Sequence, residues 1–149
     1  AAFKEALSND FVEYSKQTLL NAKAICSSLQ NNNFEIISGE TSCHMLLIDL
    51  SNKGVTGKIA EKALDNAGIT CNKNSIPFDT KSPFITSGIR IGTAAGTTRG
   101  FKQDEFKYIG NLISQVVDSL KKSDNEILET SKLVRGKVLD LCNKFPLYY

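Results

Sequence analysis

The chain has 149 residues, of which 41% are hydrophobic and 23% are charged, a composition typical of a globular domain and unlike that of a disordered segment. Its formal net charge of +2, with basic residues scattered among acidic ones, gives no support for a nucleic-acid or membrane-surface partner. No apolar run approaches the ~20 residues that a membrane-spanning helix needs, and the first residues, AAFKEALSND, lack the basic and apolar regions of a signal peptide.

The first third of the chain predicts one long helix followed by two strands. Apolar residues recur at helical spacing over 10–30, with Ser8 among the possible N-cap residues and three asparagines ending the run. Good helix formers follow Ala1 with no cap before them, so we expect the chain to begin part-way along a helix. The segments FEIIS (34–38) and HMLLIDL (44–50) predict an antiparallel pair of strands.

The middle of the chain predicts a helix, two short strands and an irregular loop. Thr56 can cap a helix over 57–67 whose inward face holds Ile59, Ala60, Ala63, Leu64 and Ala67. The segment ITC (69–71) predicts a short strand. Two prolines between 74 and 84 indicate an ordered loop, after which FITSGIRIG (84–92) returns to strand.

The last third of the chain is helical. Apolar residues lie at helical spacing from Phe106 to Leu120, and Ser123 with Glu126 forms a capping box that begins a final helix reaching about Asn143. Strands embedded among helices indicate one α+β domain over residues 1–149, a small, mostly antiparallel sheet covered by helices.

Arg90 is the strongest single candidate for binding. On a strand, Ile89 and Ile91 would share one face, while Gly88, Arg90 and Gly92 would share the other. Glycine inside a strand often marks the close approach of another group, and the guanidinium fork matches a carboxylate with two parallel hydrogen bonds. A solvated arginine on an edge strand is the alternative interpretation.

The neighbouring polar residues carry weaker predictions. Asn72 and Asn74 flank Lys73, and amides suit a heterocycle because they both donate and accept, although asparagine is also common in turns. Arg99 could donate to a substrate or could bond the carbonyl groups that end a helical turn. Cys71 would lie near a ligand bound there, with a small buried residue as the alternative.

Known catalytic and metal-binding patterns are absent from the sequence. Four single cysteines without a closely spaced pair, with one histidine, predict reduced thiols in a cytosolic or organellar interior and no metal site. His44 therefore fits a structural role better than a catalytic one. Neither a serine or cysteine triad nor a glycine-rich phosphate loop can be built, so we expect no catalytic residue in this chain.

Two blocks carry a resemblance to a known family. Residues 54–101, which contain the blocks CNKNSIP (71–77) and SPFITSGIRIGTAAGTTRGF (82–101), closely resemble the C-terminal small domain of serine hydroxymethyltransferase. The resemblance extends to YSKQTLLNAKAICSSL (14–29) and VLDLCNKFPLYY (138–149), and so covers essentially the whole chain. Blocks of this length are more specific than a single short motif.

The resemblance implies a fold, a reaction and roles for residues. Family members are pyridoxal-phosphate enzymes of the aspartate-aminotransferase-like fold, fold-type I, which convert serine and tetrahydrofolate into glycine and 5,10-methylenetetrahydrofolate. Arg90 matches the arginine that binds the substrate's α-carboxylate, and Asn74 matches the asparagine that contacts the folate ring system. Lys73 is a candidate contact for the folate tail, with a solvated lysine as the alternative.

The sequence also departs from the family. Gly39-Glu40-Thr41-Ser42-Cys43-His44 stands where the family usually has Gly-Gly-x-Asp-Asn-His, so this chain lacks that Asp-Asn pair, and Ala94 replaces a common proline. The segment with the lysine that holds the cofactor covalently is absent, as are the cofactor's phosphate loop and the aspartate facing its pyridine nitrogen. These belong to the large domain. The resemblance therefore implies an excised C-terminal domain that is inactive alone.

The resemblance also implies properties of the full-length enzyme, beside which two other hypotheses for the chain stand. The full-length enzyme would be a homo-oligomer that holds pyridoxal phosphate mainly through its large domain, in the cytoplasm or, as alternatives, in a mitochondrion or plastid. A freestanding regulatory module that holds an amino acid or another carboxylate on Arg90 is a second hypothesis. A purely structural interaction domain is a third, which leaves Arg90 and its glycines unexplained. A weaker hypothesis makes Cys71 a redox-sensitive thiol, given a partner cysteine from the large domain.

Overall fold

The computed structural model describes residues 2–147, which fold as an α+β domain with six α-helices and a four-stranded antiparallel sheet. In chain order the helices are α1 (Ala2–Ala6), α2 (Asn9–Asn31), α3 (Gly57–Asn66), α4 (Ala94–Thr98), α5 (Gln103–Ser119) and α6 (Asp124–Lys144). The strands are β1 (Glu35–Ile36), β2 (Met45–Asp49), β3 (Asn72–Asn74) and β4 (Gly88–Gly92), and a short 3-10 helix, η1 (Ser51–Lys53), follows β2. The fold class expected from the sequence is confirmed.

The sheet has the strand order β1-β2-β4-β3, with every neighbouring pair antiparallel. β4 therefore lies inside the sheet between β2 and β3, and the alternative of an edge strand for Arg90 is wrong. The register pairs Arg90 with Leu47 of β2 on one side and with Asn72 of β3 on the other.

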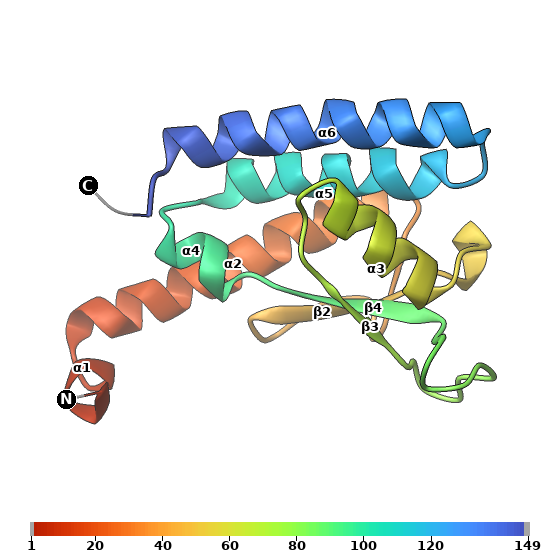
Figure 1. Ribbon diagram of the computed structural model, residues 1–149. Helices are drawn as coiled ribbons and strands as arrows, with labels where there is room; N and C mark the ends of the chain where they lie inside the picture. The colour runs from red at the N-terminus through yellow and green to blue at the C-terminus, as the bar shows by residue number, and fades with distance from the viewer. Residues whose placement is uncertain (1, 148–149) are drawn as a thin grey trace.

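The helices form layers on one side of the sheet. Figure 1 shows α3 and α2 next to the sheet, α5 beyond them and α6 farthest away, with no helix under the opposite face. Side chains that alternate toward the helices form the core, among them Leu46, Ile48, Ile89 and Ile91, each at most 6% exposed. Most of the other face of the sheet is left open, because Met45, Leu47 and Asp49 are partly exposed and Arg90 and Gly92 are exposed, whereas Gly88 is buried.

Local predictions for the helices were mostly confirmed. Ser8 and Thr56 cap α2 and α3 through their side chains, and Ser123 with Glu126 forms the capping box of α6. The predicted inward face of α3 is wrong at one position, because Ile59 is 52% exposed. In the described part of the chain no helix has the length and apolar character needed to cross a bilayer.

The strand predictions needed larger corrections. The predicted strand 69–71 is wrong, since the ladder with β4 is formed by the next three residues, Asn72–Asn74. The expected strand over 84–92 is shortened to Gly88–Gly92, and the short helix α4 after it was not predicted. The first change has a physical cause: hydrogen-bond partners on another segment, rather than local propensity, decide which short segment becomes a strand.

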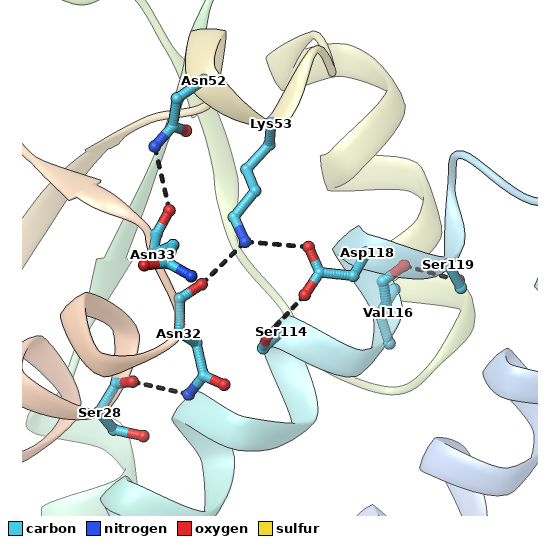
Figure 2. A network of polar contacts seen from close by, with 9 residues as sticks. All are labelled: Ser28, Asn32, Asn33, Asn52, Lys53, Ser114, Val116, Asp118 and Ser119. Atoms are coloured by element: carbon cyan, nitrogen blue, oxygen red, sulfur yellow. Dashed lines mark hydrogen bonds and ion pairs between the residues drawn. The ribbon is translucent and has the colours of Figure 1, made fainter.

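A polar network fastens η1 to the helical layer (Figure 2). Nζ of Lys53 donates to the backbone oxygen of Asn32 at 2.8 Å and to Oδ1 of Asp118 at 2.9 Å. The other oxygen of Asp118 accepts from the Ser114 hydroxyl at 2.9 Å, and Nδ2 of Asn52 donates to the backbone oxygen of Asn33 at 3.0 Å. The end of β2 is thereby joined to the end of α2 and to α5.

Candidate functional site

The open face of the sheet carries the candidate site. Since directly paired residues on neighbouring strands point to the same face, Arg90 shares this face with Leu47, Met45, Gly92 and Asn72. The Arg90 side chain is exposed, whereas Ile89 and Ile91 on either side of it are buried. The alternation expected along GIRIG is therefore present, with the guanidinium on the side away from the helices.

Arg90 lies in an open depression of about 320 Å³ that is lined by His44, Met45, Thr70, Cys71, Asn72, Arg90 and Gly92. Within residues 2–147 the ion pairs all use lysines, so none of them involves Arg90. No side-chain hydrogen bond there involves its guanidinium either. A free guanidinium beside a depression of this size can bind a carboxylate by donating two parallel hydrogen bonds to it.

The two glycines beside Arg90 have different environments. A Cβ placed on Gly92 would meet nothing closer than the His44 backbone oxygen at 3.8 Å, so bare backbone does border the depression there. A Cβ on Gly88 would lie 2.6 Å from the Ile48 oxygen and 2.7 Å from Cγ2 of Ile76. The expected strip of bare backbone therefore exists only at Gly92, because Ile76 covers the other glycine.

The structure separates two residues that the sequence grouped with Arg90. Asn74 pairs with Gly88, two residues along β4 from Arg90, does not line the depression, and donates through Nδ2 to the Ser75 oxygen at 2.7 Å. Lys73 pairs with Ile89 and so points to the helical side, where its Nζ lies 3.4 Å from Oε2 of Glu61 on α3. Lys73 and Arg90 thus lie on opposite faces of the sheet.

Cys71 lines the depression, but its thiol is poorly suited to reaction. Burial, with Glu61 and Asp65 adding repulsion, raises the pKa of Cys71 to about 12. Because the thiolate is the reactive form, this pKa argues against the redox hypothesis, which stays a prediction. His44 also lines the depression and is exposed, and its structural rather than catalytic role stays a prediction.

Asp79 is a positioning residue that the sequence analysis did not single out. It holds the loop between β3 and β4 by accepting from the Ser87 hydroxyl at 2.7 Å and from the backbone N–H groups of Ser87, Lys81 and Ile76. The Ser87 hydroxyl and then the Lys81 N–H are the largest causes that hold the pKa of Asp79 well below its usual range. An aspartate between two prolines is a common turn residue, and that pattern could have indicated the role.

Arg99 takes the second of its two predicted roles. Its Nε donates to the Phe145 oxygen at 2.6 Å and its Nη2 to the Cys142 oxygen at 3.0 Å. These carbonyl groups lie at the end of α6, where the Cys142 oxygen also accepts from the Phe145 N–H at 3.2 Å. Arg99 therefore caps a helix and joins α4 to α6, away from the Arg90 depression.

Comparison with known proteins places the chain in one family. The sequence model described as serine hydroxymethyltransferase matches residues 1–113. The serine hydroxymethyltransferase of Erythrobacter litoralis is 53% identical over 148 residues, and that of Bartonella henselae is 54% identical over 149 residues. Each alignment covers 99% of this chain and 34% of the relative, so the chain spans about a third of the length of these relatives.

Proposed function

The chain belongs to the serine hydroxymethyltransferase family, and from that premise we propose that residues 1–149 form the C-terminal small domain of such an enzyme. In the full-length protein this domain contributes contacts to the substrate carboxylate and to folate. The reaction of that protein interconverts serine plus tetrahydrofolate with glycine plus 5,10-methylenetetrahydrofolate. The Arg90 depression is the observation that carries the proposal.

Arg90 binds the α-carboxylate of serine or glycine. Support comes from its exposed guanidinium, which has no partner among the described residues, and from the open backbone at Gly92. The inner position of β4 adds to this, because a strand held on both sides by ladder hydrogen bonds fixes the Cα from which the arginine extends. Holding one end of the substrate rigidly orients the bond that reacts at its other end.

Asn74 contributes to the folate site at the edge of the same sheet face. It lies on β3 opposite Gly88, one step of two residues, about 7 Å along the strands, from the Arg90–Asn72 pair, which leaves room for a separate ligand beside the amino acid. Its amide is now turned to the Ser75 oxygen, so folate contact requires that hydrogen bond to be exchanged. Lys73 is a weaker candidate, since the pairing with Glu61 holds it toward the helices.

Pyridoxal phosphate, on which the family depends, is held mainly outside these residues. The depression has no lysine in its lining, and Lys53 and Lys73 are paired with carboxylates elsewhere. These observations support a cofactor site that lies mainly outside these residues, and no chemical step is assigned to them. The large domain of the full-length homo-oligomer supplies the cofactor site, and the 149-residue chain alone is inactive.

The test is Arg90→Lys in the full-length protein, which keeps the charge and loses the fork. We expect serine binding to weaken by roughly thirtyfold, because one of two charge-assisted hydrogen bonds and their alignment are lost. Arg135→Lys, the same change at an exposed position of α6, is the control and should bind serine normally. The 149-residue chain, assayed alongside, should show no turnover.

Two outcomes would overturn the proposal. Serine affinity in Arg90→Lys equal to that of Arg135→Lys would mean that Arg90 does not hold the carboxylate. Turnover of serine by the 149-residue chain would mean that a complete active site lies within it. An isolated chain that binds carboxylates stoichiometrically, from a gene that encodes no large domain, would favour the freestanding binding module.

A further inference from the structure

We propose that Asn72 is a specificity-determining residue of the Arg90 depression, which donates a hydrogen bond to the same carboxylate and keeps the guanidinium free for it. The inference rests on the proposed role of Arg90. It adds a residue of β3 to a carboxylate site that otherwise rests on β4 alone. From the sequence, Asn72 was only one of two amides that flank Lys73.

The ladder places Asn72 directly opposite Arg90. The two residues are register partners between β3 and β4, both are exposed, and both line the same depression. Directly opposite residues in an antiparallel pair have Cβ atoms about 5 Å apart on the same face. An anion held at the end of one side chain is therefore within reach of the other.

The amide of Asn72 has hydrogen-bonding capacity to spare. None of the side-chain hydrogen bonds in the described part of the chain uses it, whereas Asn74 is bonded to Ser75 and Asn32 to Ser28 and Asn111. A carboxylate offers about four lone-pair positions, of which a guanidinium fork takes two. Nδ2 of Asn72 can occupy a third.

Strand propensity does not explain this residue. Asparagine is depleted in strands, yet the first residue of β3 is an asparagine that pairs with the inner strand β4. Residues that oppose local propensity occur more often where they serve a site. This independent observation favours a functional role for the amide.

The absence of charge on Asn72 is as important as its N–H donors. An acidic side chain directly across the ladder would form an ion pair with Arg90 and occupy the fork. Two acidic residues near Arg90 have other partners: Asp49 of β2 accepts from the Ser51 N–H at 2.7 Å, and Glu61 of α3 pairs with Lys73. A neutral donor at 72 thus leaves Arg90 available to an external anion.

The experiment compares Asn72→Asp and Asn72→Ala in the full-length protein, with Asn125→Asp as the matched change at an exposed position in the first turn of α6. Dissociation constants are measured for serine and for serinamide, which lacks the carboxylate charge. We expect Asn72→Asp to weaken serine roughly thirtyfold and Asn72→Ala to weaken it roughly fivefold, through loss of a hydrogen bond to a charged group. Serinamide should be unaffected or bound more tightly by Asn72→Asp.

The melting temperature distinguishes a lost contact to serine from structural damage, because damage to the strand would lower it. Asn72→Asp gains a cross-strand ion pair with Arg90, so its melting temperature should match or exceed that of the parent while serine binding falls. If the aspartate variant does melt earlier, Asn72→Ala decides the question through its ratio of serine to serinamide affinity.

The outcomes separate this inference from the proposed function. Unchanged serine affinity in Arg90→Lys overturns both. Weakened serine binding in Arg90→Lys, with Asn72→Asp and Asn72→Ala binding serine like Asn125→Asp, overturns only the role of Asn72. Equal losses for serine and serinamide would indicate a disturbed strand and would also overturn it.

Discussion

Replacing Lys53 by methionine removes the ammonium group from the polar network of Figure 2 and keeps most of the apolar stem. Lys53 is only 9% exposed, and its Nζ lies 2.8 Å from the Asn32 oxygen, 2.9 Å from Oδ1 of Asp118 and 4.3 Å from the centroid of the Phe34 ring. A buried lysine with three partners on two helices and a loop should contribute measurably to stability.

The expected loss can be worked out contact by contact. The hydrogen bond to the Asn32 oxygen is worth about 1 kcal/mol. The pair with Asp118 is discounted to about 0.5 kcal/mol, because that side chain is 50% exposed. The cation–π contact with Phe34 adds about 0.5 kcal/mol. The net loss for Lys53→Met is about 2 kcal/mol, which lowers the melting temperature of a chain of this size by about 4–8 °C.

Chemical and thermal unfolding of the chain measure this loss. Lys58→Met is the matched control, since Lys58 is an exposed lysine on α3 and its replacement should change stability by less than about 0.5 kcal/mol. Lys53→Ala also removes three buried methylene groups and should cost about 2 kcal/mol more than the methionine variant. The order of stability should therefore be Lys58→Met, then Lys53→Met, then Lys53→Ala.

One result would refute the reasoning. If Lys53→Met and Lys58→Met unfold at the same denaturant concentration with the same dependence on denaturant, the ammonium group contributes nothing. The cost of removing it from water would then cancel its contacts, as happens for some buried charges. A smaller loss for Lys53→Ala than for Lys53→Met would likewise contradict the assigned value of the stem.

Two further predictions concern the sheet and its loop. Gly88→Ala should destabilise the chain by about 1–3 kcal/mol through overpacking, whereas Gly92→Ala should unfold like the parent, because only the first new Cβ meets Ile48 and Ile76 at under 3 Å. Equal unfolding midpoints would contradict this. Hydrogen bonds lower the pKa of Asp79 in the fold, so it stabilises the fold above its unfolded pKa of about 3.9, and this contribution is lost as pH falls through the lower folded value. Acid titrations of Asp79→Asn should therefore show lower stability at pH 7 than the parent and a flatter fall of stability below pH 4. A fall as steep as the parent's would refute this role of Asp79.

Local signals in the sequence determined the helices and the direction of Arg90. Helical spacing of apolar residues and the caps at Ser8, Thr56 and Ser123 depend only on neighbours within about four residues along the chain, and each was found where expected. The alternation around Arg90 is equally local, because successive residues of any strand point to opposite faces. The family resemblance, read from long continuous blocks, was also confirmed.

The errors occurred where partners lie far apart in the chain. Nothing in the apolar ITC segment or in the polar Asn72–Asn74 segment indicates which of them β4 will pair with, and the polar one forms the strand. Arg99 could not be assigned from sequence, because its acceptors at Cys142 and Phe145 come from the other end of the domain. The loop held by Asp79 was predicted to be ordered, but its hydrogen-bond acceptor was not identified.

The sequence by itself determined the family, the α+β class and the presence of an arginine on one face of a strand. Only the tertiary structure decided that this strand is an inner one, that Asn72 faces Arg90 while Lys73 turns away, and that Ile76 covers one of the two glycines. The physical reason is register: which face a residue takes follows from its own strand, but which residue lies beside it depends on how strands distant in sequence align.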